Sequence, residues 1–370
     1  MHLRPVGSTG IRLSPIGLGG VVLGEEPGDV PAARAAIEAA IDSGMNWLDT
    51  AEAYAGTANE TVIGRAMRGL STRPLVASKA DPDGGTFRRE QLHAACRASL
   101  ERLGVDHLDL YFLHWPDEPD GVPLDETWGA MGELADEGLV RAIGLSNFTR
   151  EEIEACHAAR RVDVIQDGLS LIDHLANRDL FKWAAEHDIS VVVYEPLASG
   201  LLGGGPITLE GLRRTWGDLE AWSFYDRLCA PGKLERSAAV AAELVEIAAR
   251  LDVPPAQVAV AWVLAQPGVS SALCGSRNPV HVRENSRAAE LRLSSETIVE
   301  LEAAVPLGPA FETWPSSTGS TTRDGRPASW KTVCTATTAA DAPSLPIGPP
   351  ELRFRSQSGK SELATSTRSR

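Results

Sequence analysis

The sequence predicts an α/β fold, a (β/α)8 TIM barrel, and three observations lead to this prediction. Eight short apolar runs with strand character alternate with amphipathic helical patterns. Such alternation implies parallel strands joined by right-handed crossovers, and eight of these units close into a barrel. Ionisable residues also follow successive strands, at the ends where barrels of this kind carry their chemistry.

The first expected elements are a hairpin and eight strands. The hairpin spans Leu3–Leu13, with the turn-forming run Gly7-Ser8-Thr9-Gly10 at its centre, and we expect it to close the floor of the barrel. The expected strands are Pro15–Gly19, Met45–Leu48, Leu75–Ser78, Leu108–Leu113, Val140–Leu145, Val162–Ile165, Ser190–Tyr194 and Ser270–Leu273.

The segments between these strands have the residue spacing of amphipathic helices. After the third strand, one helical face carries Leu92, Ala95, Cys96, Ser99, Leu100 and Leu103. After the fourth strand, the same spacing is formed by Leu124, Trp128, Met131 and Leu134. Gly138 follows where a glycine commonly ends a helix.

An open, doubly wound sheet is the competing architecture. Its dinucleotide fingerprint, G-x-G-x-x-G, should follow the first strand. The sequence there is Gly17-Leu18-Gly19-Gly20-Val21-Val22, which lacks the third glycine. The sequence therefore favours the closed barrel.

The barrel accounts for residues 1–312, and a different kind of sequence follows. Ser, Thr, Pro, Gly and Arg dominate residues 313–370 without apolar periodicity, so we expect a low-complexity, disordered tail. A long connection at 203–236 is rich in Gly, Trp and Arg, and loops of this length above a barrel commonly serve as lids or specificity elements.

The composition limits the partners and the compartment. The chain has 370 residues, and its net charge of −15 disfavours binding to phosphate backbones or anionic lipid. No apolar stretch approaches the roughly 18 residues of a membrane span. Its five cysteines are scattered without a C-x-x-C pair, so we expect no metal site and no disulfide framework. We expect a cytoplasmic protein that acts on a small molecule.

Four ionisable residues follow the second, third and fourth strands: Asp49, Tyr54, Lys79 and His114. Each alone has an ordinary explanation, such as a helix cap, a packing residue or a solvated lysine. Their common placement favours a catalytic centre, because the strand ends of a barrel converge. A barrel isomerase or metal-dependent hydrolase is a weaker alternative, since only His114 fits a metal ligand at these positions.

The chemistry of these groups suits the reduction of a carbonyl. A phenol has a pKa of about 10 and donates poorly at neutral pH. The Lys79 ammonium would stabilise the phenolate of Tyr54, and Asp49 would balance that buried charge. His114 would donate to the substrate oxygen. Tyr54 is then the general acid.

Several motifs resemble those of the aldo-keto reductase superfamily, in order from residue 3 to about residue 304. Besides Lys79, they are Leu48-Asp49-Thr50-Ala51-x-x-Tyr54, Asp109-Leu110-Tyr111-Phe112-Leu113-His114-Trp115-Pro116, Gly144-Leu145-Ser146-Asn147-Phe148, Tyr194-Glu195-Pro196-Leu197 and Gly275-Ser276-Arg277-Asn278-Pro279. The resemblance implies reversible, NADPH-dependent reduction of an aldehyde or ketone, with hydride from the nicotinamide and a proton from Tyr54. NADH remains an alternative cofactor.

The resemblance also implies which residues hold the cofactor. Those for the nicotinamide are Ser146, Asn147 and Gln166 at its carboxamide and Tyr194 stacked on its ring. Those for the pyrophosphate are Pro196, Leu197, Ser199 and Gly200. Those for the adenosine and its 2′-phosphate are Gly275, Ser276, Arg277, Asn278, Glu284 and Asn285.

Some positions depart from the family pattern. Val21 stands where many members have an aromatic residue, and we expect it to line the substrate pocket together with Trp115. His281 stands where some relatives have a basic phosphate ligand, so the preference for NADPH rests mainly on Arg277. A cofactor-binding regulatory or redox-sensing subunit with little turnover is the alternative function. The sequence names neither the substrate nor the oligomeric state.

Overall fold

The computed structural model describes residues 1–81, 87–116, 122–173, 177–205, 207–216, 218–219 and 228–304. The tail expected at 313–370 lies outside these residues, as does residue 312, the expected end of the barrel domain. Part of the long connection expected at 203–236 is also outside them.

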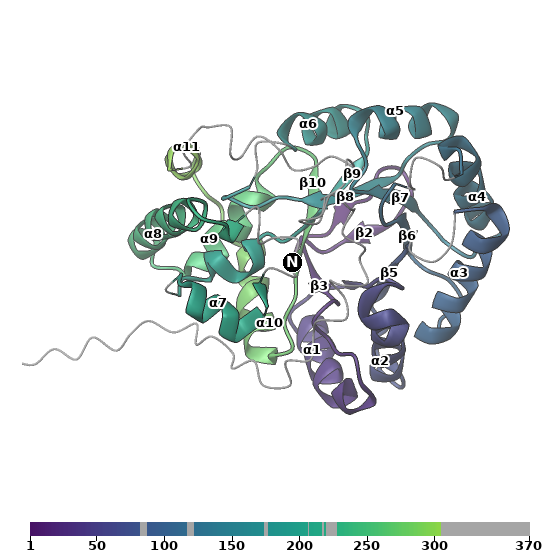
Figure 1. Ribbon diagram of the computed structural model, residues 1–370, viewed down its shortest axis with the longest axis horizontal. Helices are drawn as coiled ribbons and strands as arrows, with labels where there is room; N and C mark the ends of the chain where they lie inside the picture. The colour runs from purple at the N-terminus through teal and green to yellow at the C-terminus, as the bar shows by residue number, and fades with distance from the viewer. Residues whose placement is uncertain are drawn as a thin grey trace, which may run out of the picture.

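Eight parallel strands form a closed barrel, which confirms the predicted fold (Figure 1). The strands pair in chain order, and the last pairs with the first to close the barrel. They are β3 (Ile16–Gly19), β4 (Trp47–Asp49), β5 (Leu75–Ala80), β6 (Leu110–Leu113), β7 (Ile143–Ser146), β8 (Val164–Gly168), β9 (Ser190–Tyr194) and β10 (Val269–Cys274). Each overlaps its predicted strand, with ends that differ by up to three residues.

Two of these differences have a clear cause. Strand β5 runs two residues past its predicted end because Ala80 still pairs with Leu113 of β6, so Lys79 lies inside the strand. Strand β6 begins two residues later than predicted because Leu108 forms only an isolated bridge with Val140.

Helices surround the barrel (Figure 1). They are α1 (Val30–Asp42), α2 (Ala58–Met67), α3 (Arg89–Leu103), α4 (Leu124–Asp136), α5 (Arg150–Ala159), α6 (Arg178–Glu186), α7 (Leu209–Trp216), α8 (Leu234–Leu251), α9 (Pro255–Leu264), α10 (Pro279–Ser286) and α11 (Ser295–Ala303). Short 3-10 helices are η1 (Pro27–Asp29), η2 (Tyr54–Thr57), η3 (Ala198–Gly203) and η6 (Arg287–Ala289).

The helical patterns seen in the sequence are confirmed in α3 and α4. Helix α3 buries Leu92, Cys96, Ser99, Leu100 and Leu103. Helix α4 ends at Asp136, and Gly138 then adopts a left-handed φ of 76°, as a residue just beyond a helix end commonly does.

The N-terminal hairpin closes one end of the barrel, as predicted. Its strands are β1 (Arg4–Pro5) and β2 (Arg12–Leu13), and the chain begins over the middle of the barrel in Figure 1. Val6, Ile11 and Leu13 pack into one cluster with inward-facing strand residues. The hairpin also contacts β9, because the Gly7 N–H donates to Ser190 Oγ at 2.9 Å. Because the hairpin fills this end of the barrel, the loops that follow the strands lie at the opposite end.

A tryptophan fills the barrel interior above this hairpin. Trp47 is 1% exposed, and its indole N–H donates to Ser271 Oγ at 3.1 Å. A Cβ at position 17 would lie only 2.3 Å from the Trp47 ring, so Gly17 provides the space for the indole. Trp47 is thus a core residue.

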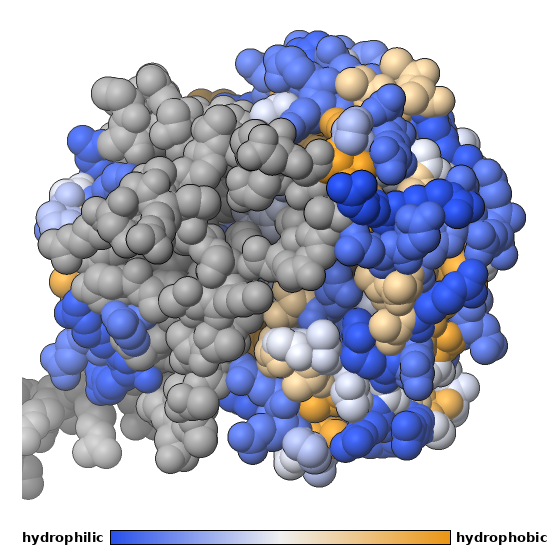
Figure 2. Space-filling view, turned by 45° about the vertical axis from the view of Figure 1, so that its right-hand side comes forward, coloured by the Kyte–Doolittle hydropathy of each residue, from blue (hydrophilic) through white to orange (hydrophobic). Residues whose placement is uncertain are grey.

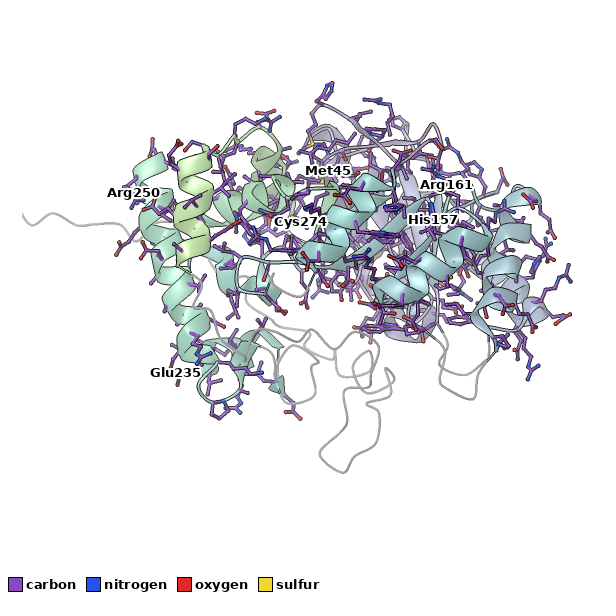
Figure 3. All side chains as sticks on the ribbon, turned by 90° about the horizontal axis from the view of Figure 1, so that it is seen from above. Met45, His157, Arg161, Glu235, Arg250 and Cys274 are labelled. Carbon is purple, nitrogen blue, oxygen red and sulfur yellow. The ribbon has the colours of Figure 1, made fainter. Side chains whose placement is uncertain are left out.

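On the face seen in Figure 2, the described part is mostly hydrophilic, with hydrophobic residues in separate patches. Figure 3 labels Glu235 near the start of α8 and Arg250 near its end, where the Arg250 guanidinium pairs with Glu300 on α11. No single helix among the described residues is long and apolar enough to span a membrane, and only the bent pair α8 and α9 meets the length and composition required when joined.

A buried ion pair joins the second and third helices behind β5. Glu60 on α2 is fully buried, and the Arg102 guanidinium on α3 donates to its carboxylate at 2.6 Å. Ser78 on β5 donates to the other carboxylate oxygen of Glu60. The two helices are therefore fixed to the strand that carries Lys79.

We expect Arg102→Met to lower the free energy of unfolding by about 3 kcal/mol, because it leaves the Glu60 carboxylate buried without its cation. Urea denaturation followed by circular dichroism measures this loss. The double variant Arg102→Met/Glu60→Gln is the control and should recover part of the stability. A loss below about 0.5 kcal/mol, typical of an exposed position, would contradict the assigned role.

Candidate active site

The four residues predicted to act together meet at one end of the barrel. The Lys79 ammonium donates to Asp49 Oδ1 at 2.6 Å and to Tyr54 Oη at 3.3 Å. The His114 and Tyr54 rings meet edge to face, with centroids 5.8 Å apart. Asp49, Lys79 and His114 are each at most 5% exposed. The structure therefore brings these four side chains together.

The charge of Lys79 is stabilised by its neighbours. Burial alone would lower the pKa of the ammonium, but the Asp49 carboxylate and the Tyr54 oxygen raise it, and the net direction is upward. A third contact, to the Thr50 carbonyl at 2.8 Å, satisfies another N–H. Asp49 is held in turn by the Gln166 amide, which donates to Oδ2 at 2.8 Å. The site therefore holds a buried cation against the phenol.

His114 has a partner that we did not predict from the sequence. Its Nδ1 lies 3.0 Å from Asp81 Oδ2, and both side chains are less than a tenth exposed. Burial lowers the pKa of His114, and the Asp81 carboxylate opposes this effect. Strand alternation did not indicate this contact, because β5 ends at Ala80 and Asp81 is the next residue.

A second acidic group lies behind the site. Glu52, two residues before Tyr54, accepts the Asp81 backbone N–H at 2.7 Å, and Arg102 approaches its other oxygen at 3.8 Å. Burial raises the pKa of Glu52 from 4.5 to about 7, with the Glu60 and Asp81 carboxylates adding to the rise. Glu52 is thus a half-buried carboxyl whose pKa is raised to about 7.

The residues expected at the nicotinamide lie beside these groups. Ser146 ends β7, Asn147 follows it, and Gln166 lies within β8; all three are at most 5% exposed. Tyr194, the last residue of β9, donates to Asn147 Oδ1 at 2.6 Å. Asn147 Nδ2 donates to the His114 carbonyl at 3.0 Å, so this polar group is joined to the end of β6.

The residues expected at the adenosine end surround the start of α10. Asn278 caps the helix, since its side chain accepts the Val280 N–H at 2.9 Å. Ser276 Oγ accepts the Asn278 N–H at 3.1 Å. The Arg277 guanidinium is half exposed and lies 3.5 Å from Asp29 at the end of η1. Arg277 thus directly precedes the N-terminus of α10, and both its positive charge and the helix N-terminus favour a bound anion.

The remaining residues of this end pack close to the barrel. A Cβ on Gly275 would lie 3.2 Å from the Gly19 carbonyl, so the loops after β10 and β3 approach closely at this glycine. Asn285 is buried on α10, and the Glu284 carbonyl accepts from Gln257 on α9 at 3.0 Å.

The loop after β9 holds an unusual backbone. Glu195, Ala198 and Ser199 all have left-handed φ angles, and Gly200 continues the run at 95°. Ser199 Oγ donates to Glu195 Oε1 at 3.1 Å. Left-handed φ in residues other than glycine costs about 1–3 kcal/mol each and gathers at functional sites. This loop contains the residues expected at the pyrophosphate, including Pro196 and Leu197.

The two residues expected in the substrate pocket both lie at this end of the barrel. Val21, after β3, is 52% exposed, and Trp115 is half-buried with its ring centroid 6.2 Å from that of His114. Within the described ranges, no group of three or more His, Cys, Asp or Glu residues could hold a metal ion.

The fold and the site define a (β/α)8 barrel with a buried Asp–Lys–Tyr centre and a histidine at the C-terminal ends of its strands. A model of the Aldo/keto reductase family matches residues 15–306. The chain therefore belongs to this family of oxidoreductases.

Three proteins are similar to this chain over most of their own length. The chain is 32% identical to the aldo-keto reductase YhdN of Bacillus subtilis, covering 84% of this chain and 97% of that protein. It is 30% identical to the NADH-specific methylglyoxal reductase of Escherichia coli (80% and 95%). It is 29% identical to a probable voltage-gated potassium channel subunit beta of rice (84% and 98%).

A solved structure is also similar. The aldo/keto reductase from Klebsiella pneumoniae, crystallised with NADP and acetate, superposes with a TM-score of 0.66 at 29% identity. The match covers 82% of this chain and 95% of that one.

The raised pKa of Glu52 predicts a stability that depends on pH. The folded protein holds this proton more tightly than the unfolded chain, so the stabilising contribution is present below pH 4.5 and is lost as pH rises toward about 7. We expect Glu52→Gln to be more stable than wild type at pH 8, by about 2 kcal/mol, and not at pH 4.5. Urea denaturation at the two pH values measures this. Equal differences at both pH values would argue against a buried, protonated Glu52.

Proposed function

We propose that this protein reduces an aldehyde or ketone to an alcohol with NADPH, and that Tyr54 supplies the proton. The observation that carries the proposal is the buried Lys79 ammonium, 3.3 Å from Tyr54 Oη and 2.6 Å from Asp49. An ammonium at this distance favours the phenolate, which makes the phenol a better acid at neutral pH. The family and the named reductases among the relatives support the same reaction.

The residues present fit a nicotinamide dinucleotide. Ser146, Asn147 and Gln166 provide buried amide and hydroxyl groups that match the donors and acceptors of a carboxamide. Arg277 and the N-terminus of α10 suit a phosphate group. When bound, NADPH supplies the hydride for the carbonyl carbon. The Klebsiella pneumoniae relative was crystallised with NADP, which supports this cofactor.

The side chains of this chain then perform the remaining tasks. His114 donates a hydrogen bond to the carbonyl oxygen and orients it. As negative charge develops there, the Tyr54 Oη–H bond breaks and its proton goes to this oxygen, which completes the alcohol. The resulting phenolate is stabilised by Lys79, whose own charge is balanced by Asp49. In alcohol oxidation the same groups act in reverse, with the phenolate as base.

The first test is NADPH consumption, followed by absorbance, with aliphatic, aromatic and sugar-derived aldehydes and ketones. Carbonyl-dependent turnover supports the proposal and begins to define the substrate. No turnover on any class, with tight NADPH binding, favours the second function described below.

We expect Tyr54→Phe to abolish most carbonyl reduction while NADPH affinity stays close to that of wild type. The reason is that the variant removes the proton donor and keeps the ring. Turnover and fluorescence titration of NADPH measure the two quantities. Full turnover in this variant would refute the role of Tyr54 as the acid.

We expect Arg277→Ala to weaken NADPH binding by about 1–3 kcal/mol and NADH binding much less, because only NADPH carries the 2′-phosphate. Titration of both cofactors measures the difference. Arg283→Ala changes an exposed arginine on α10, the helix that follows Arg277, and is the matched control that should change neither affinity. An equal loss for the two cofactors would mean that Arg277 does not contact the 2′-phosphate.

The second candidate is a cofactor-binding regulatory or redox-sensing subunit with little turnover. The observation that favours it is the similarity to a probable potassium channel subunit beta, which covers 98% of that protein. The arrangement of Asp49, Tyr54, Lys79 and His114 is compatible with either function. Single-turnover oxidation of bound NADPH by a carbonyl, without multiple turnovers, is the result expected for a sensor.

A further inference from the structure

The Asp81 carboxylate lies against one ring nitrogen of His114. Nδ1 of His114 and Oδ2 of Asp81 are 3.0 Å apart, and the two side chains are 7% and 4% exposed. A carboxylate only accepts hydrogen bonds, and a neutral imidazole has a single N–H. The hydrogen therefore lies on Nδ1, pointing to Asp81. Nε2 is left as the nitrogen through which His114 can contact a substrate oxygen.

We propose that Asp81 is a positioning residue that holds His114 as the Nδ1–H form, so that Nε2 donates to a carbonyl oxygen only in the imidazolium. This inference rests on the proposed function, in which His114 contacts the substrate. Asp81 itself touches neither substrate nor cofactor in this scheme. It acts by fixing the orientation of the ring and by stabilising its charged form, as carboxylates do for other functional histidines.

The charged groups around His114 come from the ends of two neighbouring strands, β4 and β5. Asp49 and Tyr54 come from the end of β4, and Lys79 and Asp81 from the end of β5. Burial and the Lys79 ammonium lower the pKa of His114, whereas Asp81 and Asp49 raise it. At the end of β7 the neutral amide of Asn147 contacts the His114 backbone.

The neighbouring carboxyl of Glu52 belongs to the same arrangement. The Glu52 carboxylate accepts the Asp81 backbone N–H at 2.7 Å, and the Asp81 side chain in turn contacts the His114 ring. Its contact is with the main chain of Asp81. Glu52→Gln therefore keeps an oxygen acceptor there and removes a nearby charge, which makes it a matched control for substitutions of Asp81.

The two forms of His114 differ in what Nε2 can do. The imidazolium donates from Nε2 to the substrate oxygen, and it does so in both directions because reduction and oxidation share one transition state. The neutral ring has a lone pair on Nε2 and cannot donate to that oxygen. The pH at which kcat/KM for reduction falls should therefore follow the ionisation of His114, and Asp81 should control that pH.

The direct test is ¹⁵N nuclear magnetic resonance of the full-length protein labelled at histidine. His114→Gln identifies the signals of His114 among the eight histidines. Above the pH of its titration, we expect a proton on Nδ1 and none on Nε2, with Nε2 gaining its proton as pH falls. A neutral ring with the proton on Nε2 would overturn the proposal. This readout needs no turnover, so it stands or falls separately from the proposed function.

The second test is Asp81→Asn, which keeps the shape and removes the charge. We expect its kcat/KM for reduction to fall about tenfold or more at neutral pH. The fall of kcat/KM with rising pH should shift to lower pH by about one unit or more, because His114 loses an opposite charge. Asp81→Glu should restore part of the shift, and Glu52→Gln should keep the Nδ1–H form. An unchanged pH profile in Asp81→Asn would overturn the proposal.

Discussion

The buried ammonium of Lys79 is the interaction on which the site depends. Removing such a charge from water costs several kcal/mol, and the cost is offset only by close, well-directed partners. Asp49 at 2.6 Å and the Thr50 carbonyl at 2.8 Å are those partners, and Gln166 holds Asp49 from the opposite side of the barrel. Strands β4, β5 and β8 are thereby tied to one charge. The phenol of Tyr54 is the group that this charge acts on.

Much of this arrangement follows from the sequence because a barrel converts order along the chain into proximity. Once strands alternate with helices, residues that end successive strands must converge, so Asp49, Lys79 and His114 could be brought together without coordinates. The contact between His114 and Asp81 could not. It depends on how the end of β5 continues past Ala80, and the predicted strand ended two residues too early to place Asp81 on the same face as Lys79.

The backbone of the loops is the other part that the sequence conceals. Eight residues other than glycine have left-handed φ in the described ranges, and six of them lie in loops after β4, β7 and β9. Residues such as Ala198 and Ser199 have no preference for this conformation, so composition gives no warning of it. The surrounding structure imposes it. The raised pKa of Glu52 is concealed for the same reason, because it arises from burial and from carboxylates that only the fold brings close.

The contact between Gly17 and Trp47 has a consequence for how this sequence can evolve. The indole occupies the volume that any side chain at position 17 would need, since a Cβ there would lie 2.3 Å from the ring. Position 17 therefore cannot gain a side chain alone: a larger residue there requires a smaller one at 47. Related sequences should inherit the two positions as a correlated pair, although 29 residues separate them along the chain.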